Sequence, residues 1–233
     1  MNFSRLCARG LRSGPAGHGT NIGRMTRAFI AVDVQNDFCP GGALATDRGD
    51  EVAEGIAALL ADHREDYAFV VATQDWHIDP GSHFSTEPDF VDTWPVHCVA
   101  DSDGAAMRGP LADYPFDEFF HKGEYEAAYS GFEGTSTRHA ADSGTGGTSG
   151  DGGESGVGVD GILLADWLRD HGVDTLDVAG IATDHCVRAT VLDGLKEGFG
   201  VRVLAGLCSP VDDARGRSAL DEMRDAGAEI VPA

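Results

Sequence analysis

Lysine is scarce in this sequence, and so are other features on which several classes of protein depend. Only two of the 233 residues are lysine, and 17 lysine and arginine side chains stand against 39 aspartate and glutamate side chains, for a formal net charge of −22. A protein that binds nucleic acid by neutralising phosphates needs a basic surface, so this balance excludes that class. No apolar run approaches the roughly 18 residues of a membrane-spanning helix, and we expect no span and no membrane partner.

Paired cysteines are also lacking. The cysteines are odd in number, widely spaced and without a Cys-x-x-Cys pair: Cys7, Cys39, Cys98, Cys186 and Cys208. This is not a disulfide framework, so we expect a reducing compartment, the cytoplasm. The acidic balance is typical of proteins in a salt-rich cytoplasm, where hydrated carboxylates maintain solubility, and equally of a GC-rich genome that favours Arg, Asp, Gly and Ala. The sequence leaves both explanations open.

The first 27 residues contain no acid. They hold five arginines and lack the apolar segment of a secretory signal. This composition fits an organelle transit peptide, but we favour an upstream start codon, with the working protein beginning at Met25. We therefore predict that residues 1–27 are a basic extension, disordered or outside the fold, and that residues 28–233 form one domain, as the length allows.

Short apolar runs alternate with helical patterns from residue 28 onward. The runs that predict strands are 28–34, 69–73, 118–121, 176–181, 201–207 and 229–231, and the patterns that predict helices are 51–61, 162–170, 184–197 and 214–226. This alternation predicts an α/β fold with a mostly parallel sheet. Ligands bind beyond the carboxyl ends of such strands, and Asp33, Asp75, Lys122 and residues 183–186 all fall at predicted strand ends.

One segment does not fit this pattern. Residues 135–158 contain eight glycines and almost no apolar side chains. Such a composition cannot bury enough surface to offset its ordering entropy, so we predict a flexible surface insertion. A phosphate-binding loop is a poor alternative because no Gly-Lys-Ser/Thr follows and the segment is acidic.

Four metal-ligand side chains cluster after the second predicted strand. Asp75 and His77 can lie on one side of an extended segment, a Pro80–Gly81 turn can return His83 toward them, and His97 follows. Neutral imidazoles with a carboxylate suit Zn²⁺, Fe²⁺ or Mn²⁺ with coordination positions left open. Histidines that only cap loop turns are the alternative, and four candidate ligands at one strand end favour a single divalent metal.

A cysteine lies at the start of a predicted helix. Cys186, in the segment Thr-Asp-His-Cys-Val-Arg, follows a strand, and the helix N-terminus favours a thiolate and offers free N–H groups. A buried structural cysteine is an equally good interpretation of this motif alone. Asp33 ends a buried strand and Lys122 ends another, so the two can form a structural ion pair or can serve as general base and thiol-activating cation.

Five runs together carry a resemblance to a known family. They are AVDVQNDFCPGG, TQDWHIDPGSHF, WPVHC, KGEYEAAYSGFEG and VAGIATDHCVRAT, and they resemble the nicotinamidases of the isochorismatase-like cysteine hydrolase superfamily. The resemblance extends from about residue 28 to 233; residues 1–27 and the glycine-rich segment have no counterpart in it.

The resemblance implies a single domain, a six-stranded parallel sheet flanked by helices, and a set of site residues. Cys186, Asp33 and Lys122 would be the catalytic triad, and the backbone N–H groups of Ala182 and Cys186 would form the oxyanion hole after a cis Ile181–Ala182 peptide. The remaining positions would hold the metal or the substrate ring: Asp75, His77, His83 and His97 for one divalent ion (Zn, Fe or Mn), and Phe38, Trp94, Tyr129 and Ile181 for a pyridine ring.

The activity that the resemblance implies is hydrolysis of nicotinamide to nicotinate and ammonia through a thioester, with pyrazinamide as a related substrate. The expected assembly is a monomer or a homo-oligomer. Other amide or carbamoyl hydrolases and isochorismatases of the superfamily are the alternatives, and they generally lack the Asp-x-His set. A non-catalytic metal- or ligand-binding protein is disfavoured because all three triad residues are present.

Overall fold

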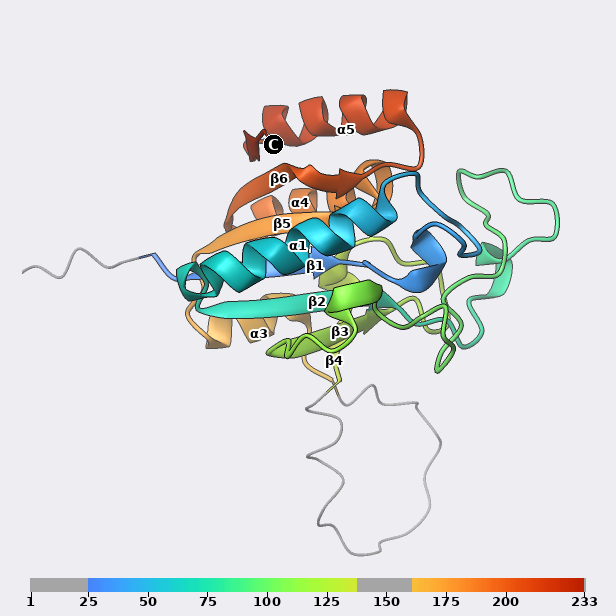
Figure 1. The fold of residues 1–233 in the computed structure, drawn as a ribbon, viewed down its shortest axis with the longest axis horizontal. Helices are drawn as coiled ribbons and strands as arrows, with labels where there is room; N and C mark the ends of the chain where they lie inside the picture. Colours follow the sequence, from blue (N-terminus) through green and yellow to red (C-terminus); the bar gives the residue numbers. More distant parts are fainter. Residues whose placement is uncertain (1–24, 138–160, 233) are drawn as a thin grey trace, which may run out of the picture.

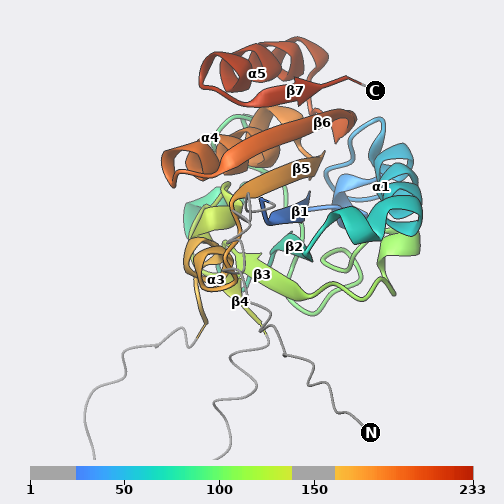
Figure 2. The ribbon, with the colours of Figure 1, turned by 90° about the vertical axis from the view of Figure 1, so that its left-hand side faces the viewer.

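The computed structural model describes residues 25–137 and 161–232 of the chain. These residues form a central sheet with helices on both of its faces (Figures 1 and 2). The sheet has seven strands in the order β4-β3-β2-β1-β5-β6-β7. The expected α/β class with a mostly parallel sheet is confirmed.

Six of the strands are parallel to one another, and they are the six that the sequence predicts. They are β1 (Arg27–Val32), β2 (Phe69–Asp75), β3 (Glu118–Lys122), β5 (Thr175–Ile181), β6 (Gly200–Ser209) and β7 (Glu229–Val231). The seventh, β4 (Thr135–Ser136), pairs with β3 in the antiparallel direction. The central strands read as continuous apolar runs because helices cover both of their faces.

The helices lie in two layers (Figure 2). Helix α1 (Gly49–His63) covers one face, and α3 (Leu164–Asp170) and α4 (Arg188–Lys196) cover the other. Helix α5 (Asp213–Asp225) lies near β7 at the end of the sheet. Helix α1 buries Val52, Ala53, Ile56 and Leu60, whose spacing of three to four residues places them on one face.

Two predicted boundaries are wrong. Residues 1–27 are not all outside the fold, since Arg27 begins β1 and the N–H of Thr26 donates to the Asp174 carboxylate at 2.9 Å. The predicted insertion at 135–158 begins too early, because Thr135 and Ser136 extend the sheet past β3. The glycine-rich composition and the lack of apolar periodicity predicted a loop there. An edge strand of two residues is too short to show the alternation of apolar and polar residues by which strands are recognised. Residues 138–158 of that segment, like residues 1–24, lie outside the described residues.

The helix predicted over 184–197 is also different in detail. A π-helical turn, Thr183–Val187, precedes α4, so the residues around Cys186 are not in a regular α-helix. Single π-helical turns of this kind are frequent at functional sites. Among the described residues, no helix is both long and apolar enough to cross a membrane.

Candidate active site

The carboxyl ends of β1, β2, β3 and β5 meet at one edge of the sheet, at the right in Figure 1. Asp33 directly follows β1, Asp75 ends β2, Lys122 ends β3, and Cys186 lies in the turn after β5. All four side chains are buried. The structure therefore brings the three predicted triad residues together and places a predicted metal ligand among them.

Lys122 is the charged centre of this group. Its Nζ lies 2.9 Å from Oδ2 of Asp33 and 3.7 Å from Sγ of Cys186, and it also contacts Oδ1 of Asp75. The Cys186 sulfur and carboxylate oxygens of Asp33 and Asp75 lie within 4.8 Å of one another. One cation thus joins the thiol to two carboxylates in the protein interior.

The protonation equilibria of this group are shifted by burial and by mutual contact. Burial raises the pKa of Asp33; Lys122 opposes that shift and Asp75 adds to it. Burial also acts to raise the pKa of Asp75, but the positive charge of Lys122 and the neighbouring His77 and His97 rings outweigh it, so this pKa is lowered. Two carboxylates that share one cation separate in this way, one as a base that can accept a proton and one that stays ionised.

The Cys186 thiol does not have the lowered pKa that a helix N-terminus alone would give. Burial raises its pKa well above the ordinary value; Lys122 acts to lower it, and the two carboxylates act to raise it further. The resting side chain is therefore a thiol. To act as a nucleophile, a thiol in this state would need a base within reach to remove its proton, and the Asp33 carboxylate lies within 4.8 Å of the sulfur.

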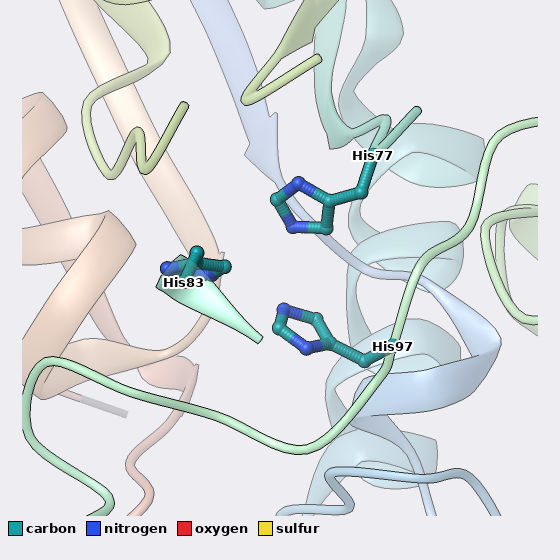
Figure 3. A group of neighbouring side chains, drawn as sticks. All are labelled: His77, His83 and His97. Atoms are coloured by element: carbon teal, nitrogen blue, oxygen red, sulfur yellow. The ribbon is translucent and has the colours of Figure 1, made fainter. Parts of the chain in front are cut away.

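Three histidines form a second group beside the triad. The rings of His77, His83 and His97 converge from three separate segments (Figure 3), and one ring nitrogen of each lies within 4.8 Å of the others. The Nε2 atoms of His77 and His97 are each 3.7 Å from Oδ2 of Asp75. Because Oδ1 of Asp75 contacts Lys122, this carboxylate joins the histidine group to the triad.

The donor atoms of this group fit a divalent metal. Nδ1 of His77 lies 2.6 Å from the carbonyl oxygen of Gly123, and Nδ1 of His97 lies 2.7 Å from that of Pro95. A carbonyl only accepts, so both Nδ1 atoms carry the proton and both Nε2 atoms present lone pairs. Nε2 of His77 and Nδ1 of His83 are buried without a hydrogen-bond partner among the described residues. Burial and the neighbouring imidazoles lower the pKa of His83 to about 4, so this ring is neutral at pH 7 and able to bind a metal.

A cavity opens between the triad and the histidine group. Its walls include three of the aromatic residues that the sequence predicts, Phe38, Trp94 and Tyr129, together with Ala182 and Cys186. Trp94 Nε1 donates a hydrogen bond to the Tyr129 hydroxyl at 3.1 Å, which ties two of these walls together. The walls are mostly apolar, as a flat aromatic ring requires.

The structure does not bring Ile181 into this cavity. Its side chain is fully buried at the end of β5 and is not among the residues that line the space. The Ile181–Ala182 peptide is cis, as the resemblance implies. The predicted oxyanion donors, the N–H groups of Ala182 and Cys186, belong to residues that do line the cavity.

Sequence reasoning missed three residues of the site. His185 lines the cavity, with its ring stacked 5.9 Å from that of Tyr129. The Thr73 hydroxyl donates to Oδ1 of Asp33 at 2.6 Å. The buried Gln35 amide donates to the Asp75 carbonyl at 2.8 Å and accepts from the Asp75 N–H at 2.9 Å. A polar residue at the end of an apolar strand was the available signal for Thr73 and Gln35, and adjacency to Cys186 was the signal for His185.

Comparison with known proteins agrees with this architecture. A family model for the isochorismatase domain matches residues 27–143 and 160–233. This chain is a member of the isochorismatase family. Among its relatives, the nicotinamidase/pyrazinamidase of Mycobacterium tuberculosis is 45% identical over 205 residues, which cover 88% of this chain and 98% of that protein.

Two solved structures of isochorismatase-family relatives superpose well. The pyrazinamidase of Pyrococcus horikoshii in complex with zinc is 33% identical, with a TM-score of 0.68 and coverage of 89% of this chain and 99% of that one. A protein of L. infantum in complex with nicotinate is 30% identical, with a TM-score of 0.69 and coverage of 89% and 93%. The six parallel strands that the sequence predicts are all present, and the sheet has a seventh, antiparallel strand, β4.

Proposed function

We propose that this chain is a nicotinamidase, a metal-dependent cysteine amidohydrolase that converts nicotinamide to nicotinate and ammonia. The observation that carries the proposal is the position of the Cys186 thiol, which lies at the wall of an aromatic cavity beside Lys122 and next to the three-histidine group. The 45% identity with a nicotinamidase/pyrazinamidase over nearly its whole length supports the same activity.

The first half of the reaction uses Asp33 as the base. The Cys186 thiol gives its proton to the Asp33 carboxylate while Sγ attacks the carboxamide carbon. The negative charge that develops on the carboxamide oxygen is held by the backbone N–H groups of Ala182 and Cys186. Asp33 then passes the proton to the departing amine, the C–N bond breaks, ammonia leaves and a thioester remains on Cys186.

The second half repeats these roles with water. Asp33 takes a proton from water as the water oxygen attacks the thioester carbon. The C–S bond then breaks, Asp33 gives that proton to the leaving Sγ to restore the thiol, and the product leaves as nicotinate with loss of its carboxyl proton to solvent. Lys122 holds Asp33 in place and offsets the negative charge that both carboxylates bring to the buried site.

The residues proposed to hold the metal are Asp75, His77, His83 and His97. When bound there, a divalent ion supplies a positive centre that can accept a lone pair from a ring nitrogen or a water molecule. Zinc, iron and manganese all suit imidazole and carboxylate donors. Phe38, Trp94 and Tyr129 would hold the ring of the substrate, with pyrazinamide as a second substrate, and Ile181 would act only through its backbone.

Further properties are proposed with the activity. The four cysteines of the described residues are all free, which supports a reducing compartment, the cytoplasm. The partners we propose are small carboxamides, with neither nucleic acid nor membrane among them, and the assembly is a monomer or a homo-oligomer. We propose one hydrolase domain that starts near Thr26, two residues before the start that the sequence predicts.

The test is ammonia release from nicotinamide by the purified chain, with the Cys186→Ala variant in parallel. Turnover by the wild type that is lost in the variant, with the metal content unchanged, is the expected result. Turnover retained by the variant would contradict the assignment of the nucleophile. Absence of turnover by metal-loaded wild type would instead favour another amide or carbamoyl substrate on the same cysteine.

A further inference from the structure

A third buried carboxylate lies near Cys186, and it has no role in the proposed reaction. Asp184 belongs to the π-helical turn that carries Cys186, and its side chain is 2% exposed. Its Oδ1 accepts the Val211 N–H at 2.8 Å, and its Oδ2 accepts the Asp212 N–H at 3.2 Å. The carboxylate therefore binds the loop between β6 and α5.

Arg215 extends this connection to a third segment. Its Nε lies 3.3 Å from Oδ2 of Asp184, and its Nη1 donates to the Phe90 carbonyl at 3.4 Å. The ring of Phe90 contacts that of Trp94 edge-on, with a centroid separation of 6.2 Å. One ion pair thus links the nucleophile turn, the loop after β6 and the loop that leads to Trp94.

All three segments contribute walls to the cavity. Cys186 and His185 come from the nucleophile turn, Val211 from the loop after β6, and Trp94 from the remaining loop. All of these wall residues lie in loops or turns outside the strands of the sheet. Their positions relative to the thiol therefore depend on contacts between loops. The Trp94 ring contacts the His185 ring edge-on with a centroid separation of 5.1 Å, and Asp184 provides a buried polar contact.

We propose that Asp184 is a positioning residue, held by Arg215, that fixes the Val211 and Trp94 walls relative to the Cys186 thiol and so sets the size of ring that the cavity admits. The inference rests on the proposed function, since it concerns the substrate site of that reaction. A carboxylate suits this role because its two oxygens accept from two neighbouring N–H groups and a guanidinium at once. A buried anion with fewer donors would be costly.

Asp184→Asn tests the proposal, because the amide keeps the shape of the carboxylate but has one accepting oxygen and no charge. Arg215→Ala is the second variant; Arg215 is 42% exposed, so its removal spares the core. We expect KM for nicotinamide to rise about tenfold in Asp184→Asn and less in Arg215→Ala, with kcat within about threefold of the wild type. The kcat/KM ratio of nicotinamide to quinoline-3-carboxamide should fall in both variants, since looser walls admit a second ring.

Glu222→Gln is the matched control. Glu222 lies on α5, like Arg215, but it does not line the cavity. The substitution removes its ion pair with Arg188, in which Oε2 of Glu222 lies 2.6 Å from Nε of Arg188. We expect its KM and its discrimination between the two amides to match those of the wild type. An Asp184→Asn variant with unchanged KM and discrimination would overturn the proposal, and so would one in which only kcat falls, because the role would then concern the thiol.

Amide hydrogen exchange separates this proposal from the proposed function. The N–H groups of Val211 and Asp212 should exchange faster in Asp184→Asn, whatever the substrate of the enzyme is. The Trp94 N–H, which donates to the His83 carbonyl at 2.8 Å, should exchange faster in Arg215→Ala. Wild-type protein without nicotinamide turnover would contradict the proposed function, whereas unchanged exchange at all three amides would contradict the positioning role.

Discussion

The Nζ atom of Lys122 lies 2.9 Å from Oδ2 of Asp33, and both side chains are completely buried. A buried ion pair is costly to form but costlier to break, because removing one partner leaves the other charge without solvent or counterion. Removal of the Lys122 ammonium would leave two carboxylates without a counterion, because Asp75 also contacts it. Lys122, which the proposed reaction uses, is thus also a residue that the folded state needs.

Replacement of this lysine by an apolar residue of similar length should therefore destabilise the fold. We expect Lys122→Met to lower the free energy of unfolding by about 3–5 kcal/mol at pH 7 and to abolish turnover. The chain supplies its own control in Lys196, its only other lysine, which is 79% exposed beside Asp193. Lys196→Met should cost at most about 0.5 kcal/mol. Urea unfolding measures both, and equal losses would contradict a stabilising role for the buried pair.

The acid limb of the pH–rate profile should report Asp33. This residue must be ionised to accept the thiol proton, and burial raises its pKa above the ordinary value of 3.8. A base with a raised pKa is lost as the pH falls through that raised value, so kcat/KM should decline at a pH above 3.8. The profile belongs to the coupled Asp33–Asp75 pair and gives its macroscopic pKa values.

The Thr73→Val variant tests whether Asp33 is the group that titrates in the acid limb. The Thr73 hydroxyl donates to Oδ1 of Asp33, and this hydrogen bond lowers the pKa of Asp33. Its removal should move the acid limb to higher pH while the alkaline limb stays in place. A limb that stays unmoved or shifts to lower pH would show that Asp33 is not the base that titrates.

Metal should be bound through the histidine group and should be removable. We expect about one divalent ion for each chain in elemental analysis, with loss of the ion and of turnover on dialysis against dipicolinate, and recovery on addition of Zn²⁺, Fe²⁺ or Mn²⁺. His83→Ala should not retain the ion, since the buried Nδ1 of His83 has no other partner among the described residues. His63→Ala is the control, because His63 is 58% exposed on helix α1. Equal metal content in the two variants would exclude His83 as a ligand.

Gly180 is the backbone position in β5 that should tolerate a side chain least. Its φ is +135°, and a Cβ there would overlap the carbonyl oxygen of Val32 and lie 2.7 Å from the Val32 nitrogen in the neighbouring strand. We expect Gly180→Ala to cost more than about 4 kcal/mol of stability. Gly172→Ala is the comparison, since Gly172 also has a positive φ, +65°, but no atoms within 4 Å of its Cβ position. This variant should cost about 1–2 kcal/mol, and a similar loss in both would show that conformation and not space is decisive.

These residues show which parts of the fold and site a sequence can reveal. Asp33, Asp75 and Lys122 were predictable neighbours, because each follows an apolar run and the carboxyl ends of parallel strands share one edge. The contact between Asp75 and Lys122 was not predictable, since it depends on the alignment of β2 with β3, where these two residues are paired. Spacing indicates which residues lie at the edge but carries no information on register.

The loops account for the remainder. Asp184 and Val211 are separated by 27 positions and meet only through a hydrogen bond between segments without periodicity. His185 was unassigned for a related reason: its stacking on Tyr129 follows from how two loops fold against each other. The raised pKa of Cys186 also required the structure, because the burial that dominates it depends on the packing of all these segments.

Salt should distinguish the two explanations of the acidic composition. With 39 acids against 17 basic residues, the folded chain repels itself, and screening of that repulsion increases with salt as the Debye length falls from about 8 Å near 0.15 M to about 3 Å at 1 M. A chain that is acidic only through its codon usage should therefore gain the same thermal stability in any salt of equal ionic strength. A surface adapted to a salt-rich cytoplasm should gain more melting temperature and turnover in about 1 M KCl than screening alone provides. Choline chloride at equal ionic strength is the control, because it screens equally but lacks a small hydrated cation. A continued rise in KCl alone would favour the salt-adapted surface, and matching curves in the two salts would exclude it.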